Sequence, residues 1–155
     1  MPTLCVLNGS AAAGGLFHAL GYDQILMKNT PKSYVWAPEL NMGLPIPHTF
    51  QAQLQSLLPL MSVRRLVLGG KIMAGDSLRA GVAHDLYKTE EELEAKILEF
   101  AQSRARLAKH GHVLAKSRAM VNQHMLDMFD KAEYYGYMSP EGFQRLDGML
   151  REAKL

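Results

Sequence analysis

The sequence predicts an α/β protein in which short strands alternate with helices over residues 1–88 and helices alone follow over residues 89–155. In the first part, apolar runs of strand length end at Gly, Asn or Pro, and apolar residues recur at helical spacing between them. In the second part only helical spacing and helix-start signals remain. Hydrophobic residues make up 48% and charged residues 21% of the 155 residues, so we expect a chain with a core that forms one domain or part of one.

The first expected elements are three strands and a helix. Residues 3–7 are an apolar run closed by an Asn-Gly pair, which predicts a buried strand. Residues 11–20 predict a helix that begins on small residues, so another group is expected to come close to the backbone there. Residues 24–27 and 34–36 predict two further strands, separated by a polar turn.

The remaining core elements are short. Apolar residues at helical spacing over residues 50–58 predict a helix that ends at Pro59. Residues 61–68 predict a second helix, stopped by Gly69 and Gly70. Residues 76–80 predict a helical turn, and residues 82–86 predict a last strand.

Helix-start signals dominate the second part of the chain. Thr89 and Glu92 have the spacing of a capping box. The helix that follows carries an apolar stripe, made of Leu93, Ile97, Phe100 and Leu107. Residues 113–129 predict an amphipathic helix, and Ser139-Pro140 predicts the start of the last one, because serine is a favoured cap and proline a favoured first residue.

Charge, cysteine content and end sequences exclude several classes of protein. The net charge of +2 is too small to indicate nucleic acid or an anionic membrane as a partner. Cys5 is the single cysteine and cannot form an internal disulfide. We expect neither a signal peptide nor a transmembrane segment, because no basic region followed by a long apolar run is present. The ending Ala153-Lys154-Leu155 is a conservative variant of the Ser-Lys-Leu peroxisomal address, so we expect a peroxisomal protein.

The glycine-rich segment at residues 9–16 is the first candidate for chemistry. It has P-loop glycine spacing, but Gly15 and Leu16 stand where Lys and Ser or Thr are required, which excludes that kind of nucleotide site. Two interpretations remain. The first helical amides face an anion or a developing oxyanion, or the small residues let strand and helix pack closely.

Glu39 is the second candidate. It follows Pro38 in a mostly apolar neighbourhood, where an unpaired carboxylate is costly and proton transfer near neutral pH is favoured. The alternatives are a glutamate with structural partners or one at a solvated strand end. No metal site is expected, because His110 and His112 are too close together and lack a third ligand.

Four segments, taken in order, resemble a known family. They are Pro2-Thr3-x-x-x-x-Asn8-Gly9-x-Ala11-x-Ala13-Gly14-Gly15-x-x-x-Ala19-Leu20-x-x-Asp23, Pro38-Glu39-Leu40-Asn41-Met42-Gly43, Arg65-Leu66-Val67-Leu68-Gly69-Gly70-Lys71-Ile72 and Leu78-Arg79-Ala80-Gly81-Val82. From residue 2 to about residue 100 the sequence resembles the crotonase (enoyl-CoA hydratase/isomerase) superfamily, most of all the plant-type peroxisomal Δ3,Δ2-enoyl-CoA isomerases. The resemblance implies the C-terminal portion of a crotonase ββα spiral over residues 1–88, followed by a helical region for capping or oligomerisation over residues 89–155.

The resemblance also implies a reaction. Gly14 would give one of two oxyanion-hole amides to the thioester carbonyl, and Glu39 would remove a proton from C2 of a 3-enoyl-CoA and return it at C4. The coenzyme A thioester is the substrate, and no cofactor is implied. Further residues of the substrate pocket would be Ala13, Gly15, Phe17, Trp36 and Leu44. Phe17 stands where hydratases carry a second carboxylate, so isomerisation is expected rather than addition of water.

The sequence departs from the family pattern in extent, because Met1 falls where the family's domain is already half built. We therefore expect another chain or a larger complex to supply the missing half, in a homo- or hetero-oligomer, and we expect this chain alone to be inactive. One alternative is a truncated gene model. The other is a non-catalytic, crotonase-derived structural subunit of a larger assembly, for which a mitochondrial location replaces the peroxisomal one.

Overall fold

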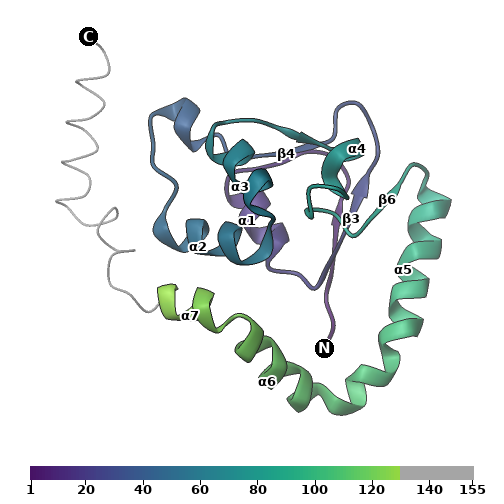
Figure 1. The fold of residues 1–155 in the computed structure, drawn as a ribbon. Coiled ribbons are helices and arrows are strands. Elements are labelled where there is room, and N and C mark those ends of the chain that lie inside the picture. Colours follow the sequence, from purple (N-terminus) through teal and green to yellow (C-terminus); the bar gives the residue numbers. More distant parts are fainter. Residues whose placement is uncertain (130–155) are drawn as a thin grey trace, which may run out of the picture.

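Two three-stranded sheets organise the first part of the chain in the computed structural model, which describes residues 1–129 (Figure 1). The first sheet has the order β1-β3-β6, and the second has the order β2-β4-β5. The strands are β1 (Leu4–Leu7), β2 (Ala11–Ala12), β3 (Gln24–Lys28), β4 (Tyr34–Trp36), β5 (Ile72–Met73) and β6 (Asp85–Tyr87). Only the β4–β5 pair is antiparallel among these described strands; the others are parallel.

β1 lies at the edge of the first sheet. It pairs with β3 from Leu4 opposite Gln24 to Leu7 opposite Met27, and its other edge carries no strand within the described residues. All four of its residues are half-buried rather than buried. The buried strand expected at residues 3–7 is therefore present, but one edge and part of its faces remain uncovered.

Short helices complete the core around the sheets. They are α1 (Gly14–Leu20), the 3₁₀ helix η1 (Glu39–Met42), α2 (His48–Leu57), α3 (Leu60–Val67) and α4 (Ala74–Ser77). α1 lies against α2, where Phe17 stacks on Phe50 with ring centroids 4.0 Å apart. In the same contact, the buried side chain of Gln53 donates a hydrogen bond to the carbonyl oxygen of Phe17 at 2.8 Å. The aromatic stack and this bond fix α1 on the core.

The second part forms a curved helical arm, made of α5 (Glu90–Arg104), the 3₁₀ helix η2 (Ala105–His110), α6 (Gly111–Val121) and α7 (Gln123–Phe129) (Figure 1). The first half of the expected capping box is confirmed, but the Glu92 side chain bonds to the residue before the cap rather than to the cap itself. Thr89 Oγ1 accepts the Glu92 N–H at 3.2 Å, and Glu92 accepts the Lys88 N–H at 2.7 Å. None of the α5 residues is fully buried within the described part: Leu93 and Phe100 of the expected apolar stripe are half-buried, whereas Ile97 is exposed.

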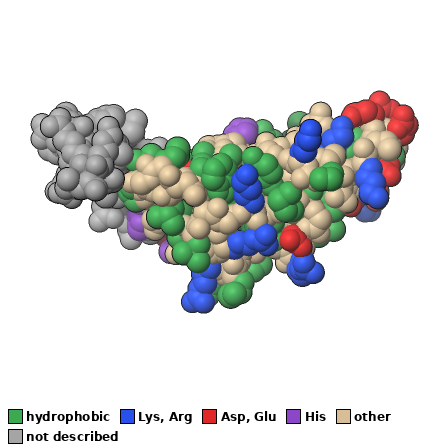
Figure 2. Space-filling model, turned by 90° about the horizontal axis from the view of Figure 1, so that it is seen from above, with side chains coloured by type: hydrophobic (Ala, Val, Ile, Leu, Met, Phe, Trp, Pro, Cys, Tyr) green, Lys and Arg blue, Asp and Glu red, His purple; other side chains and the backbone are tan. Residues whose placement is uncertain are grey.

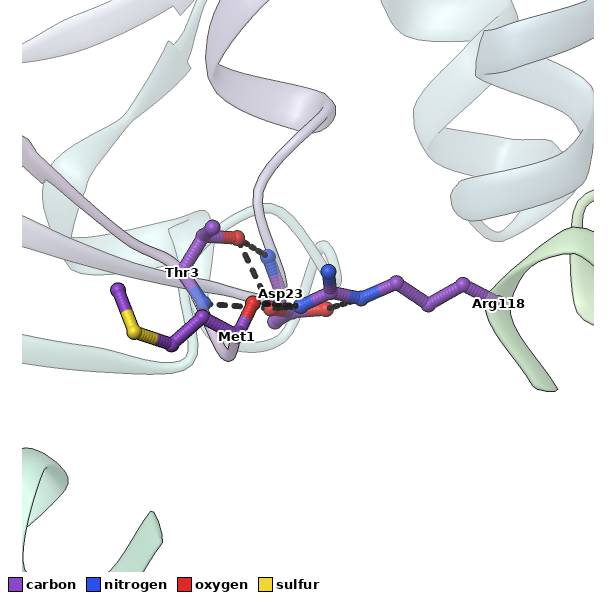
Figure 3. Close-up of polar contacts among 4 residues, drawn as sticks. All are labelled: Met1, Thr3, Asp23 and Arg118. Carbon is purple, nitrogen blue, oxygen red and sulfur yellow. Dashed lines mark hydrogen bonds and ion pairs between the residues drawn. The ribbon is translucent and has the colours of Figure 1, made fainter. Parts of the chain in front are cut away.

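Arg118 joins the arm to the core (Figure 3). Its guanidinium forms hydrogen bonds and an ion pair with the carboxylate of Asp23 and donates to the carbonyl oxygen of Met1 at 2.8 Å. Thr3 donates to the same carboxylate from its N–H at 2.6 Å and from its hydroxyl at 2.8 Å. Asp23 therefore links α6 to the start of β1.

The structure corrects several sequence expectations. Residues 11–12 are not helical, because they pair with Val35 and Trp36 of β4 as strand β2. Strand β5 was not expected at all. The turn expected at residues 76–80 forms earlier as α4, and the strand expected at residues 82–86 forms later as β6. The helix expected over residues 113–129 is divided at Asn122, and the helix start at Ser139-Pro140 lies outside the described residues.

Apolar side chains and Lys or Arg side chains lie next to one another on the face shown in Figure 2. Exposed apolar side chains occur on α3 and beside it, where Leu60 is 61%, Met61 72% and Leu68 76% exposed. Within residues 1–129, no helix has both the length and the apolar content needed to cross a membrane.

Candidate functional site

Glu39 is the first residue of η1, and its side chain is only 7% exposed. Backbone hydrogen bonds hold this turn, from the Met42 N–H to the Pro38 oxygen at 3.2 Å and from the Leu44 N–H to the Glu39 oxygen at 2.9 Å. The side-chain atom Oε2 is buried and has no hydrogen-bond partner within the described residues. A buried polar atom without a partner destabilises a fold by about 1–3 kcal/mol. Within the described residues, Glu39 therefore has neither a partner at Oε2 nor the exposure of a solvated strand end.

The start of α1 has an unusual backbone. Ala13 adopts φ 47° and ψ −127°, a conformation that favours glycine, and it is the only non-glycine residue with positive φ in the described part. Its N–H donates to the Trp36 oxygen at 3.0 Å, and its own oxygen accepts from Leu16 and Phe17 at 3.0 and 3.2 Å. The first hydrogen bonds of the helix thus begin at Leu16, as expected for a helix N-terminus.

Gly14 and Gly15 are exposed, and a Cβ built on either would meet nothing within 4 Å. Close packing of strand and helix, the second interpretation of this segment, does not explain these glycines. An open backbone at the first turn of α1 leaves amides that can face a ligand.

The pairing of β2 with β4 brings the two candidate segments together. Ala12 lies opposite Trp36, and Ala13 is hydrogen-bonded to it. Gly14 follows directly on one side, and Glu39 follows three residues after Trp36 on the other. The segments expected to carry the oxyanion donor and the acid/base therefore leave neighbouring strands of one sheet.

The other expected pocket residues are not gathered in one place. Phe17 is 3% exposed and belongs to the core, so it does not line an open pocket. Leu44 lines an apolar cavity of about 330 Å³ next to η1, together with Leu40, Pro45, Ile46, Leu54, Val63 and Val67, and the side chains of Gln51 and Gln55. Trp36 is half-buried and donates its indole N–H to the Gly69 oxygen at 2.9 Å.

The structure also shows a contact of the Trp36 ring that the sequence did not reveal. The Lys71 ammonium group lies 4.9 Å from the Trp36 ring and 4.2 Å from the Tyr34 ring, as in cation–π pairs. Asn41 of η1 touches Gly69, because a Cβ at Gly69 would lie 2.5 Å from Asn41 Oδ1. The Gly69-Gly70 pair signalled only a helix end, since its partners lie far away in sequence.

Cys5 and His84 are among the titratable groups outside this site that have shifted pKa values. Burial raises the pKa of the Cys5 thiol, which makes it a poor nucleophile. Burial also lowers the pKa of His84, whose Nδ1 accepts a hydrogen bond from the Ile25 N–H at 3.1 Å. His84 is therefore a neutral structural residue. Within the described residues, no group of three or more potential metal ligands is gathered.

No family model matches the sequence. The chain is 32% identical to enoyl-CoA delta isomerase 3 of Arabidopsis thaliana over 136 residues, which are 84% of this chain and 56% of that protein. It is 30% identical to enoyl-CoA delta isomerase 2, peroxisomal, of the same plant over 121 residues, which are 76% of this chain and 50% of that protein. The chain thus spans about half the length of these relatives.

The fold is similar to that of an enoyl-CoA hydratase from Mycobacterium marinum, with a TM-score of 0.75 at 21% identity, over 90% of this chain and 60% of that one. Three findings identify the family: the similarity to these relatives, this fold and the two neighbouring candidate segments. The chain belongs to the crotonase (enoyl-CoA hydratase/isomerase) family, as a partial chain.

Proposed function

We propose that this chain supplies the acid/base and one oxyanion donor of an enoyl-CoA isomerase site, which moves the double bond of a 3-enoyl-CoA to the 2-position in β-oxidation of fatty acids. The observation that carries the proposal is the buried, unpartnered Oε2 of Glu39, in a chain whose relatives are enoyl-CoA delta isomerases. A carboxylate left without partners by the fold is available to a substrate proton.

The proposed reaction needs one base. Glu39 removes a proton from C2, and the electron pair moves onto the thioester carbonyl oxygen to give an enolate. The amide of Gly14 donates a hydrogen bond to that oxygen and stabilises the charge. The enolate then collapses with the double bond between C2 and C3, and Glu39 returns the proton at C4. The thioester of coenzyme A is the substrate, and no further cofactor takes part.

The cavity beside η1 supports this assignment, because Leu44 and its neighbours offer a mostly apolar space of about 330 Å³ for an acyl chain. Phe17 supports isomerisation over hydration. It occupies the position of the second hydratase carboxylate and is stacked on Phe50 in the core, where it has no group that could activate water.

We also propose that a second polypeptide completes the site with the other oxyanion amide and most of the coenzyme A pocket. A peroxisomal location is supported by two plant relatives whose names include that organelle and by the residues Ala153-Lys154-Leu155, which lie outside the described part. Removal of these three residues from a fluorescent fusion should then abolish import into peroxisomes.

Glu39→Gln tests the proposed chemistry in the complex purified from the native source with this chain tagged. The amide keeps the size of the side chain but cannot accept the C2 proton, so conversion of 3-enoyl-CoA to 2-enoyl-CoA should fall by at least about a thousandfold. Glu94→Gln, in an exposed residue of α5, is the matched control and should leave turnover unchanged. Undiminished turnover in Glu39→Gln would exclude Glu39 as the base.

A non-catalytic structural subunit is the second candidate, and the exposed apolar side chains of α3 with the open edge of β1 favour it. In that case the native complex would form normally and would show no isomerase activity that depends on Glu39. Cell fractionation separates the candidates further, because a large mitochondrial complex supports the structural role.

A further inference from the structure

We infer that Trp36 is a positioning residue, which holds the 3₁₀ helix of Glu39 in a fixed place relative to the start of α1 by way of Gly69 and Asn41. The effect on catalysis rests on the proposed function of Glu39, whereas the mechanical link does not. We call the contacts of Trp36, Gly69 and Asn41 the Trp36 brace.

Trp36 makes one hydrogen bond toward each half of the candidate site. Its carbonyl oxygen accepts the N–H of Ala13, the residue before Gly14, at 3.0 Å. Its indole Nε1 donates to the Gly69 carbonyl oxygen at 2.9 Å, across 33 residues of sequence. A shift of this residue would therefore be felt at the start of α1 and at the turn after α3.

Gly69 passes the constraint on to η1. Its φ of 74° turns the chain after α3, and its N–H is held by the Leu66 oxygen at 2.9 Å. The Cβ of any other residue here would lie 2.5 Å from Asn41 Oδ1, so the backbone of Gly69 lies against the end of the Asn41 side chain. Asn41 is two residues after Glu39 in the same short helix.

Lys71 and β5 keep the Gly69 turn in place. The Lys71 ammonium group lies over the rings of Tyr34 and Trp36, which point from the same face of β4. The next residue, Ile72, pairs with Val35 of the same strand. The turn is thus tied to β4 by the indole N–H, by the ammonium group and by the sheet.

Such a brace matters for the proposed reaction, because one carboxylate must reach both C2 and C4 of the substrate while one amide donates a hydrogen bond to the thioester oxygen. These groups must keep a fixed relation, and a displacement of about 1 Å can lower a rate by about a hundredfold. Neither Trp36 nor Gly69 needs to touch the substrate for this effect, which is why we assign a positioning role.

The test uses the full chain and amide hydrogen exchange, which needs no activity. The reporters are the amides of Met42, Gly43 and Leu44, which bond to oxygens of residues 38–40. Gly69→Ala should raise their exchange at least about tenfold, because its Cβ displaces Asn41. Asn41→Ala removes the three nearest atoms that this Cβ would meet, so the double variant should recover the protection lost through that contact, although alanine stays strained at φ 74°.

Gly81→Ala is the matched control. Gly81 also has φ 74°, and its Cβ would lie 2.9 Å from Pro59 Cδ rather than against η1. This variant should lower the melting temperature without selective exchange at the three reporter amides. Trp36→Phe provides a milder variant, which keeps an aromatic ring but loses the indole N–H and the five-membered ring that carries it. It should raise the same exchange, whereas Tyr34→Phe on the same strand should not.

Two outcomes would overturn the inference: unchanged reporter exchange in both Gly69→Ala and Trp36→Phe, or equal loss of protection in Gly69→Ala and in the double variant. Trp36 is the single tryptophan, so its fluorescence emission gives a second readout. The emission should shift to the red in Gly69→Ala and in none of the other variants that keep Trp36. In the native complex, Gly69→Ala should lower kcat at least about tenfold with little change in KM. If the isomerase activity of the native complex does not depend on Glu39, the proposed function is refuted. The result of the hydrogen-exchange experiment remains valid in that case.

Discussion

Two residues of the candidate site are in states that the fold alone does not favour. Ala13 has a backbone conformation suited to glycine, and Glu39 has a buried oxygen without a partner. Backbone strain of this kind costs about 1–3 kcal/mol, and so does the unpartnered oxygen. Unfavourable local states concentrate at functional sites, where they set the geometry of reacting groups. Ala13 and Glu39 lie on neighbouring segments, and this strengthens the proposal that each belongs to a functional site.

Ala13→Gly is expected to stabilise the chain. Glycine adopts φ 47° without steric strain, and this relief exceeds the additional entropy of glycine in the unfolded chain. The free energy of unfolding, measured by urea denaturation, should rise by about 0.5–1 kcal/mol. Ala12→Gly is the matched control in strand β2, where φ is not positive, and it should lower the free energy of unfolding. A loss of stability in Ala13→Gly would show that Ala13 is not strained.

His84 should make stability depend on pH in the mildly acidic range. Its pKa lies below the ordinary value of 6.5 because burial disfavours the charged form, and its Nδ1 already accepts the Ile25 N–H. The unfolded chain therefore binds a proton below pH 6.5 that the folded chain rejects. The free energy of unfolding should fall as the pH decreases through 6.5, and it should level off below the lowered pKa.

Urea denaturation from about pH 5 to pH 8 measures this dependence. Other titratable or charged side chains border the two cavities that His84 lines: Tyr22, Asp23, Asp85, Lys96, Glu99, Arg104 and Arg118. His84→Asn keeps a hydrogen-bond acceptor and should remove most of the slope around pH 6.5. The exposed His124 provides the control His124→Asn, which should retain it. An unchanged slope in His84→Asn would contradict the prediction.

At the scale of elements, the sequence predicted those with a long enough pattern. The apolar run of β3 and the helical spacing of α2 extend over several residues each, and both elements are found close to the expected bounds. β2 and β5 contain two residues each, too few for any periodicity, and they are strands only because β4 lies between them. α1 was expected three residues too early, because alanines that favour a helix were drawn into a sheet by tertiary pairing.

The candidate site shows the same division. Gly14 and Glu39 stand in local motifs, so the sequence alone marks them. The Trp36 brace joins residues 33 positions apart and carries no local signal, and only the structure shows that the indole is engaged by Gly69. Burial of Phe17 depends on Phe50, which lies on another helix.

Arg118 should control how firmly the helical arm is held. Burial raises the pKa of Asp23, but the Thr3 N–H, the side chains of Arg118 and Thr3 and the charge of Arg118 lower it more, so it lies below the ordinary value. Both side chains of the ion pair are about a third exposed, 31% for Asp23 and 32% for Arg118, so solvent weakens the pair to about 1 kcal/mol. Arg118→Ala should raise amide exchange across α6 and α7 several-fold, while β3 stays protected.

Lys116→Ala, an exposed residue on the same helix, is the control and should not change that exchange. The stabilisation by Asp23 is present above the pKa of an unfolded aspartate and should be lost as the pH falls through its lowered folded value. Equal exchange in Arg118→Ala and the wild type would mean that other contacts, such as the one between α2 and α7, hold this part of the arm.

At the scale of the whole molecule, the described residues leave three kinds of apolar or unpaired surface. α3 presents Leu60 and Met61 to solvent, α5 buries none of its residues, and β1 has an unpaired edge. The matched part is only 56% and 50% of the two relatives, so they have further chain with which to cover such surfaces. A partner that covers them here would complete the core as well as the proposed active site.

The chain expressed by itself should therefore be poorly soluble or oligomeric, and inactive toward 3-enoyl-CoA. An open strand edge and contiguous apolar surface favour association with another chain. Val6→Lys, in the half-buried middle of β1, should shift the population toward monomer by placing a charge at this edge. The matched control Lys109→Val, on the exposed arm, should not.

With one oxyanion donor absent, about 2.7–4 kcal/mol of transition-state stabilisation is lost even when Glu39 is present. Sedimentation and a 3-enoyl-CoA assay decide the matter, because an active, monodisperse wild-type monomer would show that the described core is already complete.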